Sequence, residues 1–218
     1  MGFLYFLGIA LGASILGGLN GAIITSRLVY KEDIRSHGSG NAGLTNFLRT
    51  YGSRAIFLLI LIDVLKTAVP VILGGTIVQY NFVFGTASER MMIGRIWGGL
   101  FAMIGHAYPW LYRFKGGKAV LAGGTLVLFL DLRVAALVLG VFLVAVILTR
   151  YVSLGSILAG IALPVSFLIF GFGFWATLIS ALCGAFVVYR HRENVDRLLR
   201  GQERKVSFGR RGRDSDRS

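Results

Sequence analysis

The chain has 218 residues, of which 55% are hydrophobic and 15% are charged, and its mean hydropathy is +0.71. A soluble domain of this length cannot hide so much apolar surface in one core, so the composition predicts an integral membrane protein. The net charge is +13, but ten of the 23 basic residues lie between Arg190 and Arg217. The cytoplasmic end of a membrane protein explains that tail without nucleic-acid binding. The lone Cys183 excludes a disulfide framework and a thiolate metal site.

Apolar stretches follow one another along the chain, and a transmembrane helix needs about 20 mostly apolar residues. The predicted spans are Phe3–Thr25, Ala55–Gln79, Met91–Leu111, Ala119–Leu130, Val134–Thr149, Leu154–Phe170 and Gly171–Tyr189. The fourth is short, and the last two join through Gly171-Phe172-Gly173, where glycine permits a tight turn. The predicted fold is an all-α integral membrane protein with seven transmembrane helices.

The basic residues indicate how the bundle is oriented. With seven spans and a cytoplasmic C-terminus, 19 of the 23 lysines and arginines lie on the cytoplasmic side. Arg90 and Arg133 lie outside, and Lys66 and Arg95 lie within spans. Because cytoplasmic loops carry an excess of Lys and Arg, this distribution predicts an external N-terminus and a cytoplasmic C-terminus.

A polar segment with repeated glycines leads into the second span. Glycines at 38, 40 and 43 free the backbone, so that successive amides can form a nest around anionic oxygens. Ser39, Asn41 and Thr45 offer further donors, and Arg49 offers a bidentate charge. A flexible loop with a helix N-cap fits the same composition.

A second polar segment, Phe114-Lys115-Gly116-Gly117-Lys118, stands just before the fourth span. That span begins on the cytoplasmic side, so its unpaired amides and positive dipole end point at whatever the loop holds. The second span begins on the same side, and we expect two helix N-termini to face one anion site. The spacing differs from that of a Walker loop, and a positive-inside anchor with a turn is the alternative interpretation.

A third polar segment follows the last span, from His191 to Gly201. On a continuing helix His191 and Asn194 lie about 300° apart and share a face, whereas His191 and Asp196 lie about 140° apart. The spacing therefore favours a His/Asn pair, with an amphipathic helix at the lipid surface as the alternative.

Ionisable residues elsewhere have simpler interpretations. Asp63 and Lys66 lie one helical turn apart in the second span, and we expect them to neutralise each other in a structural role. The histidines at 37, 106 and 191 all fall at cytoplasmic helix ends. No carboxylate or thiolate spacing around them is typical of a metal site, so we expect no metal.

Three separated motifs resemble the bacterial PlsY family of acyl-phosphate:glycerol-3-phosphate acyltransferases. They are the run Gly38–Arg49, the pattern GH..P....FKGGK from Gly105 to Lys118, and HRENV.RLLRG.E from His191 to Glu203. The resemblance covers residues 1 to 203, which form the predicted membrane domain. Residues 204–218 lie outside it, and their composition predicts a basic, disordered cytoplasmic tail.

The resemblance implies an enzyme of the bacterial inner membrane whose active site faces the cytoplasm. It implies transfer of an acyl group from acyl phosphate to the 1-hydroxyl of glycerol 3-phosphate, giving lysophosphatidate and inorganic phosphate in phospholipid synthesis. No cofactor or metal is implied. The implied catalytic residues are Ser39, Arg49, His191 and Asn194. The implied substrate-binding residues are Gly38, Gly40, Asn41, Gly43, Thr45, Asn46, Lys115, Gly116, Gly117, Lys118 and Glu193.

The second motif departs from the family pattern, which usually continues with a further glycine and then Val-Ala-Thr. Here Ala119-Val120-Leu121-Ala122 follows, and Thr125, a turn later, is a candidate replacement for the missing hydroxyl. Either Lys115 or Lys118 can be the more important lysine of this motif.

Because phosphate is a good leaving group, we expect the acceptor hydroxyl to attack the mixed anhydride directly, without an acyl-enzyme serine. His191 and the donor's own phosphate are both candidate proton acceptors.

Two other functions remain open at this point. His191 and Asp196 satisfy the H-x-x-x-x-D spacing of an unrelated group of acyl-CoA-dependent acyltransferases. A carrier of phosphorylated solutes is the other alternative. A carrier needs access from both faces, however, and the polar clusters are predicted on one.

Overall fold

The computed structural model describes residues 2–206, which are all-helical and contain no strand. The elements are α1 (Gly2–Gly17), α2 (Gly21–Thr25), the π-helical turn η1 (Ser26–Tyr30), the 3-10 turn η2 (Ile34–Ser36), α3 (Leu44–Tyr51), α4 (Ile56–Asn81), α5 (Ala87–Ala107), the 3-10 turn η3 (Trp110–Tyr112), α6 (Val120–Leu128), α7 (Leu132–Thr149), α8 (Val152–Ile169), α9 (Phe174–Arg190) and α10 (Arg192–Leu199). Residues 207–218, most of the predicted disordered tail, lie outside the described residues.

Each predicted span overlaps a helix, but the number of spans remains a prediction. Within the described part of the chain, four helices are long and apolar enough to cross a membrane: Gly2–Tyr30, α4, α7 and α8. A fifth is added if α9 and α10, which meet at a bend of 55°, form one span. Neither α5 nor α6 is among them.

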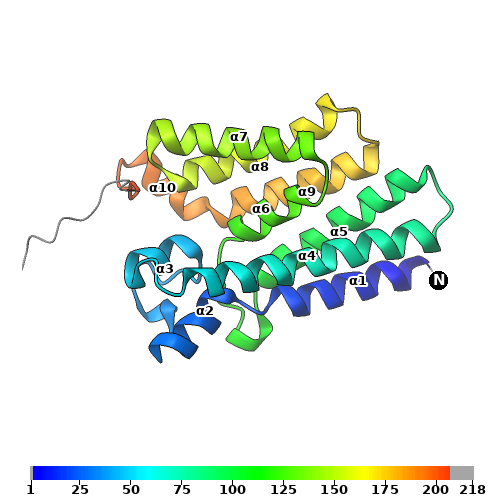
Figure 1. Ribbon diagram of the computed structural model, residues 1–218. Coiled ribbons are helices and arrows are strands. Elements are labelled where there is room, and N and C mark those ends of the chain that lie inside the picture. Colours follow the sequence, from blue (N-terminus) through cyan, green and yellow to red (C-terminus); the bar gives the residue numbers. More distant parts are fainter. Residues whose placement is uncertain (1, 207–218) are drawn as a thin grey trace, which may run out of the picture.

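The long helices form two groups that meet along the bundle (Figure 1). Helices α1, α4 and α5 pack against one another, and α8 packs against both α7 and α9. The groups are joined where α5 meets α9 and where α6 contacts α4, α5 and α7. Helices α1, α4, α5, α6, α7, α8 and α9 alternate in direction, so α2, α3 and α10 gather at one end while the start of α1 lies at the other (Figure 1).

Glycines allow the close approach of α4 and α5. A methyl group on Gly98 would collide with the carbonyl of Pro70, and one on Gly94 would collide with the carbonyl of Gly74. Small residues at such a crossing let two backbones approach to van der Waals contact, which drives helix association where lipid replaces water.

Helix α6, which corresponds to the short fourth predicted span, ends inside the bundle. Helix α6 has nine residues, a rise of about 14 Å, which is less than half of the hydrocarbon thickness of a bilayer. Arg95 donates from Nη1 to the carbonyl of Leu130 at 3.4 Å, and the carboxylate of Asp131 accepts the backbone N–H of Arg133 at 2.9 Å at the start of α7. Backbone groups freed within a membrane need such partners.

The connection between the first two long helices differs from the sequence prediction. The glycine-rich segment does not lead directly into the second span, because α3 forms first and packs Phe47 into the interior. Gly52 and Ala55, with φ of 72° and 64°, then turn the chain into α4. The helix N-terminus that directly follows the glycine-rich loop therefore belongs to α3, and the expectation that the α4 N-terminus faces an anion stays a prediction.

Candidate active site

The first polar loop, residues 34–43, is held by a side chain from α3. The Asn46 amide nitrogen donates to the carbonyl of His37 at 3.0 Å, and its oxygen accepts the backbone N–H of Ser39 at 2.9 Å. Gly38 has a φ of 61°, and a methyl group there would collide with the Asn46 carboxamide. Asn46 thus shapes the loop, and the Ser39 side chain stays exposed at its tip.

Arg35 joins this loop to the second motif. Asp33 accepts bonds from Arg35 at 2.9 and 2.8 Å, and Arg35 Nη1 donates to the carbonyls of Tyr112 at 2.8 Å and Lys115 at 3.2 Å. The hydrogen bonds from Arg35 hold the pKa of the Asp33 carboxyl well below its usual range. The charged pair therefore persists at neutral pH and fixes the two motifs relative to each other.

The second polar loop is held in place by hydrogen bonds to the backbone of its two glycines. Gly116 N–H donates to the carbonyl of Ala107, and Gly117 N–H donates to the carbonyl of His106, both at 3.2 Å. The Gly117 carbonyl accepts a bond from Arg190 Nη2 of α9 at 3.0 Å. Both backbone groups of Gly117 are thus paired, and Lys118 follows directly from a fixed backbone.

The third motif begins with a break in the last helix. The chain bends by 55° between α9 and α10, so the continuous helix assumed for the third motif is not present. His191, at the bend, is 2% exposed, and its Nδ1 donates to the carbonyl of Val187 at 2.8 Å. Because a carbonyl only accepts, the proton of the neutral ring is on Nδ1 and the lone pair is on Nε2.

Asn194 connects the second and third motifs. Its side-chain oxygen accepts a bond from the Lys118 ammonium, and its nitrogen donates to Glu203 Oε1 at 2.7 Å. Glu203 also accepts from the Ser153 hydroxyl at 2.7 Å and from Arg197 Nε at 2.8 Å. A chain of side chains thus runs from the second loop through α10 to α8.

The electrostatics of this group favour an anionic ligand. Burial lowers the pKa of Lys118, and the nearby Arg197 lowers it further. Burial alone raises the pKa of Glu203, but the hydrogen bonds from Arg197, Ser153 and Asn194 outweigh it and lower that pKa overall. Burial and the neighbouring Arg204 also lower the pKa of Arg49. An anion placed beside Lys118 and Arg49 would reverse both effects, since an opposite charge stabilises the protonated form.

The structure separates the two lysines of the second motif. Lys118 is half-buried and contacts Asn194, whereas the Lys115 side chain is exposed and only its carbonyl is bonded, to Arg35. Thr125 donates its hydroxyl to the carbonyl of Leu121 at 2.9 Å, so its proton is used within α6. Glu193 is exposed on α10, and its charge acts on the Lys118 ammonium.

The first loop and α3, which carry Ser39 and Arg49, lie at the same end of the bundle as α10 (Figure 1). Arg49 Nη2 donates to the carbonyl of Arg204 at 3.5 Å, which brings the first motif against the segment that follows α10. The other predicted residues of the first loop, Gly40, Asn41, Gly43 and Thr45, belong to the same turn or to the start of α3. The three motifs are therefore adjacent in space, as their predicted location on one side requires.

Residues of this region that were not assigned to it from the sequence include Arg35, Ser153, Arg190 and Glu203. Two of them had a signal, because Glu203 ends the third motif and Arg190 directly precedes His191. Ser153 lies in an apolar span and had none.

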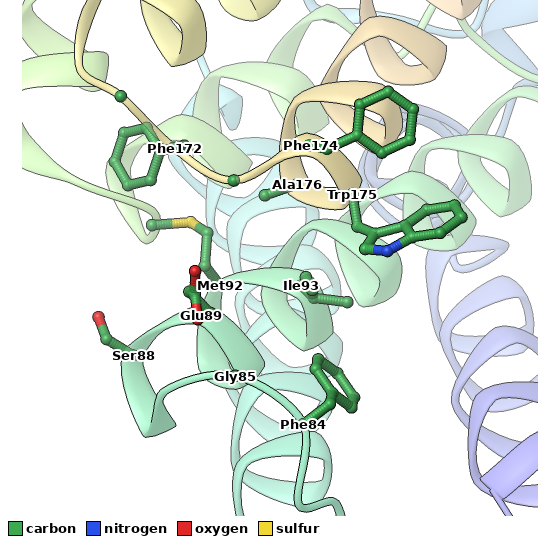
Figure 2. Close-up of a pocket in the computed structure, with 12 residues that line it drawn as sticks. Phe84, Gly85, Ser88, Glu89, Met92, Ile93, Phe172, Phe174, Trp175 and Ala176 are labelled. Carbon is green, nitrogen blue, oxygen red and sulfur yellow. The ribbon is translucent and has the colours of Figure 1, made fainter.

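The opposite end of the bundle carries a hollow of different chemistry (Figure 2). It is lined by Phe84, Gly85, Ser88, Glu89, Met92, Ile93 and the hairpin residues 171–176. The Glu89 carboxylate in this hollow already accepts the backbone N–H of Thr86 at 2.7 Å, as part of the N-terminal cap of α5. Aromatic rings and one acidic group do not suit a phosphate, so we place the candidate site at the end that holds the motifs.

Comparisons with known proteins identify the family of this chain. A family model described as glycerol-3-phosphate acyltransferase matches residues 7–201. A glycerol-3-phosphate acyltransferase of Finegoldia magna is 37% identical and aligns over 94% of this chain and 98% of its own length. One from Syntrophomonas wolfei is 38% identical over 88% of this chain and 93% of its own length.

Solved structures give the same result. The glycerol 3-phosphate form of PlsY, an integral membrane glycerol 3-phosphate acyltransferase, matches with a TM-score of 0.78 at 31% identity, covering 93% of this chain and 96% of that one. Its lysophosphatidic acid form matches with a TM-score of 0.77 at 30% identity, over 93% and 95% of the two chains. The chain belongs to the glycerol-3-phosphate acyltransferase family of integral membrane proteins, of the PlsY type.

Proposed function

We propose that this protein transfers an acyl group from acyl phosphate to the 1-hydroxyl of glycerol 3-phosphate, giving lysophosphatidate and inorganic phosphate. The observation that carries the proposal is the half-buried Lys118, held against Asn194 at the end of the bundle where the three motifs meet. Similar PlsY structures are described as glycerol 3-phosphate and lysophosphatidic acid forms, which supports the acceptor and the product.

The site is suited to positioning two phosphorylated substrates. Both the acceptor and the proposed donor carry phosphate, and Lys118, Arg49 and the exposed Ser39 side chain can hold their oxygens. The acceptor oxygen bonds to the acyl carbonyl carbon, the bond from that carbon to the phosphate oxygen breaks, and phosphate leaves with the electron pair. Holding the reactants in this geometry supplies a large part of the rate enhancement.

The hydroxyl proton needs an acceptor in this reaction. His191 can serve, because its Nδ1 is bonded to Val187 and its unprotonated Nε2 remains available. The departing phosphate of the donor is the other candidate. Burial lowers the pKa of His191 to about 4. Activity of a His191→Ala variant against pH therefore distinguishes them: loss of a pH-dependent limb on the acid side supports the histidine, and an unchanged profile supports the phosphate.

We further propose that the chain crosses the bacterial inner membrane seven times, with its N-terminus outside and its active site facing the cytoplasm. The excess of basic residues among the loops at the candidate-site end supports this orientation. Cysteines introduced at Ser88 and at Lys31, which lie in elements at opposite ends of the bundle, should be labelled by an impermeant reagent from opposite sides of sealed vesicles. Labelling of both from the same side would refute the topology.

The donor is tested with purified protein, glycerol 3-phosphate and either acyl phosphate or acyl-CoA. We expect acyl phosphate to give equal amounts of phosphate and lysophosphatidate. Phosphate without the lipid would mean hydrolysis, and product from acyl-CoA alone would refute the proposed donor. The acyl-CoA alternative relies on His191 and Asp196, but Asp196 is exposed whereas His191 is buried.

A further inference from the structure

A buried charged network lies beneath the second loop. Asp63 and Lys66 of α4 form the predicted ion pair, with Oδ1 and Nζ 2.7 Å apart, and Lys66 Nζ also lies 2.8 Å from Nδ1 of His106 at the end of α5. The three residues are 1%, 4% and 3% exposed. The ion pair was expected from its spacing, but the contact with His106, which is 40 residues further along the chain, was not.

The hydrogen-bond chemistry fixes the orientation of each group. An ammonium only donates, so His106 Nδ1 accepts from Lys66 and the neutral ring carries its proton on Nε2. Asp63 Oδ1 accepts a second bond from the backbone N–H of Gly21 at 2.9 Å, which ties the network to the first turn of α2. Neighbouring helices therefore hold the imidazole in one orientation.

The His106 ring supports the second loop. A methyl group on Gly117 would collide with His106 Nε2 and would come within 2.6 Å of the carbonyl oxygen of Ala42, in the first loop. A methyl group on Gly116 would collide with the carbonyl of His106. The imidazole therefore packs directly against Gly117, which also meets Ala42 of the first loop, and Lys118 is the next residue.

Stability alone does not explain a charged network at this position. An ion pair in a low-dielectric interior adds little stability relative to well-packed apolar residues, because desolvation offsets the attraction. Asp63 and Lys66 would neutralise each other without a third member. The third member is His106, whose carbonyl accepts the Gly117 N–H and whose ring contacts Gly117.

We propose that Asp63, Lys66 and His106 form a positioning network that sets the Gly116-Gly117 backbone and thereby holds the Lys118 ammonium at the phosphate-binding position. The network acts through Lys118 and does not itself touch substrate. This inference rests on the proposed function, because the phosphate of glycerol 3-phosphate is the ligand that Lys118 would bind.

A double-mutant cycle tests the proposal. Full-length His106→Ala, Lys118→Met and the double variant are purified in detergent, and KM for glycerol 3-phosphate and kcat are measured for each. We expect His106→Ala to raise KM by roughly tenfold. We expect it to have no further effect once Lys118 is methionine, because a residue that acts through Lys118 has nothing left to position. Independent, multiplying effects of the two changes would overturn the proposal.

A conservative variant separates positioning from folding. In His106→Asn the carboxamide oxygen can still accept from Lys66, but the ring atoms beneath Gly117 are lost. We expect a melting temperature close to that of the wild type together with a raised KM for glycerol 3-phosphate. An unchanged KM in this variant would overturn the proposal, including the case in which His106→Ala fails to fold.

The matched control is Ser166→Ala, which removes another fully buried polar side chain whose hydroxyl bonds only to its own helix, at the carbonyl of Leu163. We expect it to leave KM unchanged. Failure of the proposed function is distinguishable, because it appears in the wild type as absence of lysophosphatidate. Calorimetric titration with inorganic phosphate gives a readout without turnover: weaker binding by His106→Asn than by wild type supports the positioning role, and equal binding contradicts it.

Discussion

Replacing Lys118 with methionine removes one ammonium group while keeping a side chain of similar length. In the structure that group binds Asn194, and in the proposed reaction it also binds a phosphate oxygen. Hydrogen bonds to charged groups contribute about 1.5–3 kcal/mol each. We therefore expect kcat/KM for glycerol 3-phosphate to fall by about 10- to 150-fold.

The assay for Lys118→Met follows lysophosphatidate formation while glycerol 3-phosphate is varied at saturating acyl donor. Lys115→Met belongs in the same experiment, and we expect it to have the smaller effect because its side chain is exposed. Lys31→Met, an exposed lysine at the same end but outside the three motifs, controls for the loss of one positive charge. A kcat/KM for Lys118→Met within twofold of the wild type, in protein that melts normally, would refute the role given to this residue.

Three further outcomes follow from the same contacts. Because the pKa of Lys118 is lowered, its charge is lost at a lower pH than that of an ordinary lysine, so KM for glycerol 3-phosphate should rise on the alkaline side. An equally steep rise in Lys118→Arg would contradict this assignment. Glu203→Gln should destabilise the protein by about 1 kcal/mol or more at neutral pH. Since the folded-state pKa of Glu203 is lowered, its contribution is present above the unfolded pKa and disappears as pH falls through the folded value. Melting curves of both proteins against pH should therefore converge in acid. Gly117→Ala should raise KM for glycerol 3-phosphate at least tenfold, because its methyl group collides with His106; kinetics like those of the wild type would contradict the loop packing.

Hydropathy placed the long helices well because a bilayer imposes a length and an apolar composition on each one. It failed where tertiary contacts replace hydrophobicity. The end of α6 is held by Arg95, and α3 is a short helix packed through Phe47, so neither depends on a long apolar run. The break at His191 has no glycine or proline in the sequence to mark it.

The location of the candidate site could be predicted from the order of the three motifs along the chain. The prediction that all three motifs lie on the cytoplasmic side was enough to place them at one end of the bundle. Successive helices alternate in direction, so every second loop lies at the same end. The contacts between motifs were not predictable, since Lys118 and Asn194 are 76 residues apart and Arg35 and Lys115 are 80 apart. No periodicity within one helix reports a pairing of that kind.

The contacts of Asn194 explain why an amide, and not a carboxylate, suits this position. Its oxygen faces the Lys118 ammonium and its nitrogen faces the Glu203 carboxylate, so one neutral group satisfies a cation and an anion together. An aspartate would neutralise Lys118, which the proposed reaction requires as a free charge for phosphate, and it would place a second carboxylate beside Glu203. The amide instead orients the ammonium through a hydrogen bond and leaves its charge uncompensated. Of the two carboxylates whose charges act on Lys118, Glu193 is exposed and Glu203 is bonded to Arg197, so a phosphate oxygen can become the principal counter-charge of Lys118.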